Sequence, residues 1–370
     1  MGIDFTPERW AQIKETYGRW WARDLDRPLV PVRVRGRDPG RAKPDAPLLD
    51  QANCGDFSVS PERVIDRIDY ELSTCHYLGD SFPWFNMDCF GPGVIAAFLG
   101  ATLDNSTGRV WFHPPSRKPI GEIHFRFDPD NAWFRRLCDI YRAGMRRWQG
   151  QVLMTMTDLG GNLDILSSFR PGEDLLMDLY DEPGEVKRLV WEAHEAWHRY
   201  FDALNAVLQP LNPGYSDWAN IYSEKPSYML QCDFSYMIGP GMFEEFAAPE
   251  LAATCRRLDR SFYHLDGKGQ IAHLDAVLAI PELGGVQWVP GDGAPDCRHW
   301  PEIYKKIAAA KKNIQVLGDL DALDAVTTQV GSGKGVHLRG ICLPGPEENS
   351  AAFRKRLERH GVGWHPPSLT

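Results

Sequence analysis

Several features that define other classes of protein are missing from this sequence of 370 residues. Its eight cysteines include no C-x-x-C pair, and no apolar run approaches the roughly 20 residues that a membrane-spanning helix needs. The first residues have neither the basic start nor the apolar run of a signal peptide. We therefore expect a cytoplasmic protein with free thiols and no membrane partner.

Positive charge is also scarce. Lysine and arginine together number 41, against 50 for aspartate and glutamate, which gives a formal net charge of -9. Nucleic-acid binding requires a basic face, so we expect no nucleic-acid partner.

Neither a low-complexity linker nor an internal repeat divides the chain. We expect a single domain over 1–370, with an N-terminal extension, the first strand and lid loops in 1–120 and the main part of a barrel in 121–370. The region 36–60 is rich in glycine and proline, which favours a long loop over the pocket.

Short apolar segments alternate with helical segments from about residue 150 onward. The expected strands are 151–157, 227–231, 261–263, 285–289, 314–317 and 335–338, and the expected helices are 174–181, 184–207, 241–258, 270–279, 299–311, 321–330 and 346–359. A further strand is expected at 29–34, and another within 78–87 or near 122–127. Strands that alternate with helices form parallel sheets. No G-x-G-x-x-G motif follows the first strand, so we expect an α/β fold of the (β/α)8 TIM-barrel type rather than an open dinucleotide-binding sheet.

In such a barrel the functional residues gather at the carboxyl ends of the strands. The expected catalytic residues are Asp158, Asp233, Tyr236 and His264. The expected substrate-binding residues are Arg33, Arg35, Trp84, Asn162, Trp288, Asp292 and Arg339. An aspartate that follows a strand can instead cap the next helix, and for Asp292 and Asp319 both roles stay open.

The sharpest local feature is the segment YHLDG at 263–267. Residues two apart on a strand point to the same side, so His264 and Asp266 should converge. With Cys342 from the last strand they would form a metal site, since imidazole, carboxylate and thiolate all bind Zn²⁺. Two alternatives stay open: His264 is a general acid or base oriented by a carboxylate, or the pair only fixes the turn that follows.

Several segments resemble the uroporphyrinogen decarboxylase superfamily. They are 158–207, which begins DLGGNLDILSSF, CDFSYMIGPGMFEEFAAPEL at 232–251, YHLDG at 263–267 and PGPEENSAAFRKRL at 344–357. The resemblance extends over roughly 150–360 and implies the same (β/α)8 barrel, with a pocket at the carboxyl face.

The superfamily includes decarboxylation of uroporphyrinogen without a cofactor, in which a motif resembling R-Q-A-G-R binds substrate carboxylates. The matching stretch here, VRVRGR at 32–37, offers arginines but not that motif. It also includes methyl transfer between a corrinoid protein and a thiol such as coenzyme M, at a zinc site with a His-x-Cys pair and a later cysteine. Here the pair is His264-x-Asp266, with an aspartate in place of a thiolate, and Cys342 aligns with the later cysteine.

The resemblance to the cobalamin-dependent methyltransferase branch implies an enzyme that moves a methyl group to an acceptor activated at a metal site. The methyl group would come from a corrinoid or a methylated small molecule. The implied cofactors are Zn²⁺ and a corrinoid on a separate partner protein, because no corrinoid-binding domain is recognisable in this chain. One alternative is a cofactor-free decarboxylase of a polycarboxylate held by Arg33, Arg35 and Arg37, and another is a non-catalytic binding barrel. A homodimer is expected only because it is the commonest assembly.

Overall fold

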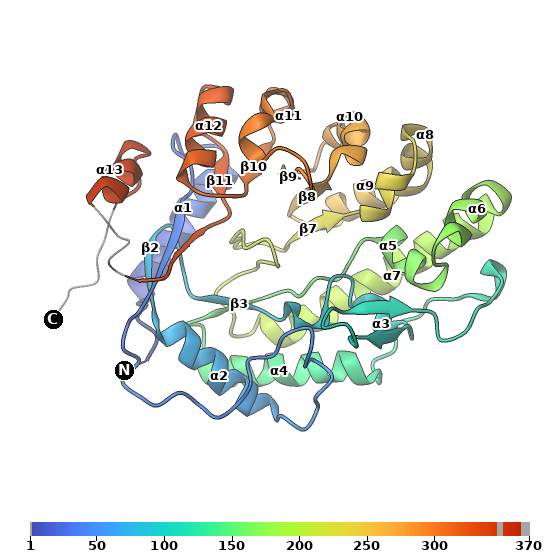
Figure 1. Ribbon diagram of the computed structural model, residues 1–370, viewed down its shortest axis with the longest axis horizontal. Coiled ribbons are helices and arrows are strands. Elements are labelled where there is room, and N and C mark those ends of the chain that lie inside the picture. Colours follow the sequence, from blue (N-terminus) through green and yellow to red (C-terminus); the bar gives the residue numbers. More distant parts are fainter. Residues whose placement is uncertain (1, 346–350, 364–370) are drawn as a thin grey trace.

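The computed structural model describes residues 2–345 and 351–363 (Figure 1). The helices are α1 (Pro7–Trp21), α2 (Pro61–Ser73), α3 (Ile95–Phe98), α4 (Ala132–Trp148), α5 (Asn162–Phe169), α6 (Glu173–Asp181), α7 (Pro183–Leu208), α8 (Pro240–Met242), α9 (Ala248–Arg257), α10 (Leu274–Leu278), α11 (Pro301–Ala309), α12 (Leu320–Val330) and α13 (Ala351–Arg359). The strands are β1 (Pro31–Arg35), β2 (Cys75–Gly79), β3 (Trp84–Asn86), β4 (Thr102–Asp104), β5 (Trp111–His113), β6 (Leu153–Thr155), β7 (Ser227–Gln231), β8 (Arg260–Asp266), β9 (Gly285–Val289), β10 (Asn313–Val316), β11 (Val336–Leu338) and β12 (Ile341–Leu343). The start of the predicted closing helix, 346–350, lies outside the described residues.

Several helices begin where the sequence supplies a capping side chain. Thr6 and Ser60 each precede a proline and accept a hydrogen bond from the backbone amide three residues later, at 3.3 and 3.4 Å. Proline suits the first helical position because its missing N–H would have no partner there. Asp319 likewise caps α12 by accepting from two backbone amides at 2.9 and 3.1 Å. Of the two roles that the sequence left open for Asp319, the structure shows helix capping.

Parallel strands form the central sheet, in the order β11-β10-β9-β8-β7. Figure 1 shows α9, α10, α11 and α12 in a row outside these strands, with α2, α4 and α7 on the opposite side of the molecule. The mixed α/β class and the parallel sheet predicted from the alternation of strands and helices are confirmed. The register places one polar residue of each strand in a single row: Gln231, His264, Gln287, Gln315 and His337.

The N-terminal strands flank this sheet. β1 pairs in parallel with β12 and antiparallel with β2, while β3 pairs in parallel with β6. An isolated parallel bridge joins Leu29 to His337 of β11. The strand expected at 29–34 is therefore found as this bridge and β1, and the one expected within 78–87 as the end of β2 and β3. The segment 122–127 contains no strand.

The hydrogen-bonded ladders of the described strands do not join into one closed ring, so a closed barrel is not confirmed. The β3–β6 pair is joined by a ladder neither to β1 and β2 nor to β7, and between β6 and β7 the segment 212–217 takes the place of a paired strand. The Asn212 side chain bonds the backbone N–H and C=O of Met154 at 3.0 and 2.8 Å. The Asp217 carboxylate accepts from the amide of Met229 at 2.6 Å. A loop and its side chains thus satisfy strand-edge groups that would otherwise lack partners.

Helix α1 covers the end of the sheet at which the strands begin. Trp20 donates a hydrogen bond from Nε1 to the carbonyl of Val336, the first residue of β11, at 3.1 Å. It also stacks on Phe262, with ring centroids 6.0 Å apart, and is fully buried. With this end covered, a ligand site belongs at the carboxyl ends of the strands.

The predicted loop at 36–60 contains no helix or strand. It packs on α4, where Arg136 donates to the carbonyl of Val59 at 2.6 Å. None of the helices in the described ranges combines the length and apolar character needed to cross a membrane.

Candidate metal and substrate site

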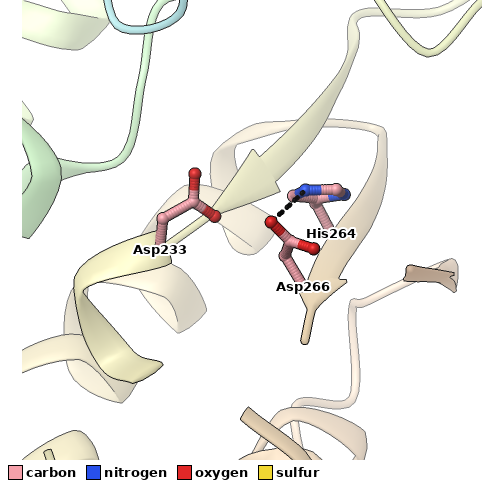
Figure 2. Close-up of side chains that lie close together, drawn as sticks. All are labelled: Asp233, His264 and Asp266. Carbon is pink, nitrogen blue, oxygen red and sulfur yellow. Dashed lines mark ion pairs between the residues drawn. The ribbon is translucent and has the colours of Figure 1, made fainter. Parts of the chain in front are cut away.

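Asp233, His264 and Asp266 converge at the carboxyl ends of β7 and β8 (Figure 2). His264 and Asp266 are two residues apart on β8 and so share a face, while Asp233 follows the end of β7. One ligand atom from each residue lies within 4.8 Å of the other two, and His264 Nε2 is 3.8 Å from Asp266 Oδ2. The structure thus brings the predicted pair together and adds Asp233 as the third member.

The protonation states in this cluster follow from its surroundings. Burial lowers the pKa of His264, and the nearby carboxylate of Asp266 offsets that shift only in part. Restricted hydration raises the pKa of Asp233, although the residue lies at the pocket mouth, and the carboxylates of Asp266 and Asp158 raise it further. A neutral imidazole and an ionised carboxylate are the forms that bind metals, so the lowered pKa of His264 favours metal binding, whereas the raised pKa of Asp233 means that a metal must displace a proton there.

The donor set fits a divalent cation. Zinc binds imidazole nitrogen and carboxylate oxygen at about 2.0–2.2 Å, which places tetrahedral ligand atoms roughly 3.3 Å apart. The 3.8 Å between His264 Nε2 and Asp266 Oδ2 is slightly wider, so a small side-chain movement brings both atoms to bonding distance. An imidazole with two carboxylates suits Zn²⁺ and is also compatible with other first-row metals.

Cys342 lies elsewhere. It is on β12, in register with Arg33 of β1, and it is the one exposed cysteine of the eight. The chain turns at Gly340, between β11 and β12, and this turn directs β12 toward β1 rather than toward β8. The structure therefore does not bring Cys342 to the His264 pair.

Cys342 instead lines a small cavity of about 160 Å³, together with Arg33, Trp84 and Arg339. The guanidinium of Arg33 lies over the Trp84 ring, 5.1 Å from its centroid. Arg339 donates to the carbonyl of Trp218 at 3.2 Å. Among the described residues, neither arginine is ion-paired with a carboxylate, so both charges are available to an anion.

Two buried polar groups face the same cavity. Ser81 is 2% exposed and Asn220 is 3% exposed, and both line it. The Ser81 hydroxyl and Asn220 Oδ1 have no hydrogen-bond partner within the described ranges. Buried polar groups normally find partners, so an unpaired hydroxyl beside two guanidinium groups that have no carboxylate partner in the described part of the chain is typical of a site for a small anionic group. We call this cavity the arginine pocket.

Trp218 contacts one residue of the metal-ligand cluster and one residue of the arginine pocket. Its ring meets that of His264 edge to face, with centroids 5.1 Å apart and an interplanar angle of 88°. The guanidinium of Arg339 also lies over this ring, 6.0 Å from its centroid. The indole thus links His264 to Arg339 through two ring contacts.

A second cavity, of about 410 Å³, opens beside Asp233 and is lined by Asp164 and Tyr236. The Asp164 carboxylate accepts from the backbone amides of Asp233 and Phe234 at 3.0 and 2.7 Å, which holds the turn after β7 in place. Burial and the charge of Asp233 raise the pKa of Asp164. Tyr236 is 57% exposed at the mouth, and its ring packs so closely on Gly267 that a Cβ there would lie 3.0 Å away.

Asp158 is buried behind this cavity. Its Oδ1 accepts from the amides of Gly160 and Gly93 at 2.9 and 3.3 Å. Burial raises the pKa of Asp158 to about 7, since these two hydrogen bonds only partly compensate for lost hydration. It supports the loops at the cavity wall and adds negative charge next to Asp233.

The structure places the remaining predicted residues away from the cluster. Asn162 turns toward α9 and donates to Glu250 at 2.7 Å. Trp288 points to the opposite face from Gln287, as neighbours on a strand do, and packs on Trp300 with centroids 5.2 Å apart. Arg35 and Asp292 are exposed and line neither cavity.

Sequence reasoning missed the row of glutamines and Trp218, which contacts His264 and Arg339. A signal was present, because Gln287 interrupts the apolar strand GVQWV and Gln315 lies between the apolar residues Ile314 and Val316 in NIQV. Trp218 lies in an irregular segment with no such pattern.

No protein-family model and no curated protein sequence matches this chain. Comparison of structures finds a methyltransferase from Methanosarcina mazei with a TM-score of 0.58 and 12% sequence identity, covering 95% of this chain and 99% of that chain. At this identity the likeness shows a shared fold and leaves activity to be argued from the site.

Proposed function

We propose that this chain is a methyltransferase-like enzyme that activates a methyl acceptor at a divalent metal held by Asp233, His264 and Asp266. The observation that carries the proposal is the convergence of these three side chains at adjacent strand ends. The methyltransferase from Methanosarcina mazei supports it through its similar fold. We further propose membership of the uroporphyrinogen decarboxylase superfamily, with a (β/α)8 arrangement whose ladders are interrupted on both sides of the β3–β6 pair.

The proposed metal is Zn²⁺, and the proposed methyl donor is a corrinoid on a partner protein or a methylated small molecule. When bound, the metal would supply Lewis-acid activation of an acceptor thiol or hydroxyl. His264 and Asp266 hold one side of the site from a single strand, which fixes their relative orientation. Asp233 would complete the ligand set from the end of β7, and the proton that the acceptor releases would leave to solvent through the open cavity beside Asp233.

The arginine pocket indicates the class of substrate. Arg33 and Arg339 would bind one anionic group, with the Ser81 hydroxyl as a further donor. Its volume of about 160 Å³ is below the roughly 300 Å³ at which sites for drug-sized ligands begin. The cavity therefore suits a carboxylate, sulfonate or phosphate on a small molecule better than a porphyrinogen macrocycle, which disfavours the decarboxylase alternative.

Metal analysis tests this proposal directly. Protein purified without chelator should carry about one divalent metal per chain, and removal by chelator should be reversed by Zn²⁺. His264→Ala and Asp266→Ala should lose the metal, whereas Cys342→Ser and Asp292→Asn should keep it. A wild-type protein that neither carries nor takes up metal would rule out the proposed site.

Methylcobalamin serves as the probe for activity, because its absorbance changes on demethylation. With a small anionic thiol as acceptor, we expect turnover in the wild type and in Asp292→Asn. Arg33→Gln should raise KM for the thiol more than it lowers kcat, because Arg33 binds a part of the substrate remote from the reacting atoms. Carbon dioxide release from uroporphyrinogen without any methyl transfer would favour the decarboxylase instead.

A further inference from the structure

Polar side chains cross the buried face of the central sheet in a single row. His264, Gln287, Gln315 and His337 are register neighbours on β8, β9, β10 and β11. Gln287, Gln315 and His337 are completely buried. Uncharged amides cost free energy in a core unless they are hydrogen-bonded, and apolar residues of similar size are tolerated there. The row therefore needs a reason beyond packing.

The hydrogen bonds along the row have one possible direction. Gln315 approaches the backbone carbonyl of Ala219 at 2.8 Å. A carbonyl only accepts, so the Gln315 amide nitrogen must face it. The Gln315 oxygen then faces Gln287 and accepts from that residue's amide nitrogen. This leaves the Gln287 oxygen toward His264, 2.5 Å from Nδ1.

That sequence of contacts decides the tautomer of His264. Because the Gln287 oxygen accepts, His264 Nδ1 must carry the proton. Nε2 of the neutral ring is then an unprotonated acceptor, and it is the atom 3.8 Å from Asp266 Oδ2. Which ring nitrogen binds a metal is set by the hydrogen bond that the other nitrogen makes.

The far end of the row is consistent with the same direction. His337 Nδ1 lies 3.2 Å from the Gln315 amide nitrogen and accepts from it, so its proton is on Nε2. Nε2 lies 3.4 Å from the Tyr17 hydroxyl, which donates onward to the carbonyl of Asp80 at 3.3 Å. Burial lowers the pKa of His337 to about 3, which keeps this ring neutral. Two backbone carbonyls thus anchor the row, and neither amide can be reversed without placing two acceptors together.

We propose that Gln287 is a positioning residue, which Gln315 and the carbonyl of Ala219 orient so that His264 presents an unprotonated Nε2 to the metal site. The assignment of the tautomer rests on the hydrogen bonds alone, and only its consequence for metal binding rests on the proposed function. An amide at this position holds the ring without adding a charge next to Asp233 and Asp266. The ring orientation is then set before any ligand binds.

The test compares Gln287→Leu with Gln287→Glu in metal-free, full-length protein. Leucine removes the acceptor, while a buried, protonated glutamic acid keeps both contacts, because its carbonyl oxygen accepts from His264 Nδ1 and its hydroxyl donates to the Gln315 oxygen. Histidine ¹⁵N NMR, with the His264 signal assigned from His264→Ala, should report Nδ1–H in the wild type and in Gln287→Glu. Gln287→Leu should show a mixture of both tautomers, and Gln315→Leu a smaller change in the same direction. Gln329→Leu, a glutamine outside the row, is the matched control.

Titration with Zn²⁺ alone is the second readout. Loss of an outer partner of a metal-binding histidine typically weakens affinity by about 10–100-fold, so Gln287→Leu should fall in that range and Gln287→Glu should restore most of the loss. A proton on Nε2 in the wild type, or an unchanged tautomer in Gln287→Leu, overturns the positioning role. If the wild type shows Nδ1–H but binds no Zn²⁺, the positioning role stands and the proposed metal function fails.

Discussion

Replacement of Asp158 by asparagine should stabilise the protein, and more strongly at pH 8 than at pH 5. Asp158 is 9% exposed, and burial raises its pKa from 3.8 to about 7. In the unfolded chain this carboxyl group loses its proton near pH 4. Between about pH 4 and pH 7 the folded protein thus binds more protons than the unfolded chain, so the free energy of unfolding falls as pH rises. Asparagine keeps an oxygen for Gly160 and Gly93 but does not titrate.

The magnitude follows from the same values. One pKa unit corresponds to about 1.4 kcal/mol. At pH 8, where Asp158 is ionised in both states, the difference between 3.8 and about 7 costs the folded wild type roughly 4 kcal/mol. At pH 5 the same pair of values gives a cost of less than about 2 kcal/mol. The stabilisation by Asp158→Asn should therefore be about 2.5 kcal/mol larger at pH 8 than at pH 5.

Denaturant unfolding of the wild type and Asp158→Asn at both pH values measures this difference. Asp292→Asn removes the same charge from an exposed position and is the matched control. If Asp158→Asn changes stability equally at both pH values, or destabilises the protein at pH 8, the reasoning about the buried carboxyl group is refuted.

Two further predictions concern packing and the arginine pocket. Gly285→Ala should lower the Tm, because a Cβ there would lie 2.2 Å from the Phe262 ring and 2.6 Å from the Asn313 carbonyl, and overpacking of this kind costs about 1–3 kcal/mol. The control Gly18→Ala, which has open space around it in α1, should raise the Tm. Equal shifts of the Tm in the two variants would contradict the reasoning. A thiol reagent should modify Cys342 first, since the other cysteines are buried. Methanesulfonate, a small anion that should bind in the arginine pocket, should slow that reaction in the wild type but not in Arg33→Gln. Rapid modification of a second thiol in native protein would argue against the described burial of the other cysteines.

Much of the sheet could be predicted from the sequence because its strands are short, apolar and separated by helices. β7 and β9 have the predicted bounds, and β8 extends from Arg260 to Asp266 where only 261–263 was expected. The extension has a physical reason: His264 and Asp266 are polar but pair with β9 within the ladder. Polarity at a strand end marks a site, but it does not mark where the strand stops.

The candidate site was predictable only in part. The spacing of His264 and Asp266 fixes their common face, which periodicity alone supplies. The position of Cys342 depends on the direction of the chain after Gly340, and no local pattern encodes that direction. Trp288 was assigned to the site because it ends an apolar strand, yet strand alternation sends Gln287 inward and Trp288 outward. Which of the two faces of a strand points inward depends on how the strand pairs with its neighbours in the sheet. The sequence of the strand alone does not provide that information.

The gap between β6 and β7 has a consequence for how the molecule fluctuates. There the amides of Met154, Met156 and Met229 bond to the Asn212 side chain, the Ser216 carbonyl and the Asp217 carboxylate rather than to a neighbouring strand. Withdrawal of one loop would expose these amides to solvent while every strand ladder stayed intact. Hydrogen exchange of these three amides should therefore proceed through local opening, whose free energy is well below that of global unfolding. The same loop carries Trp218, so an opening there would also disturb its contacts with His264 and Arg339.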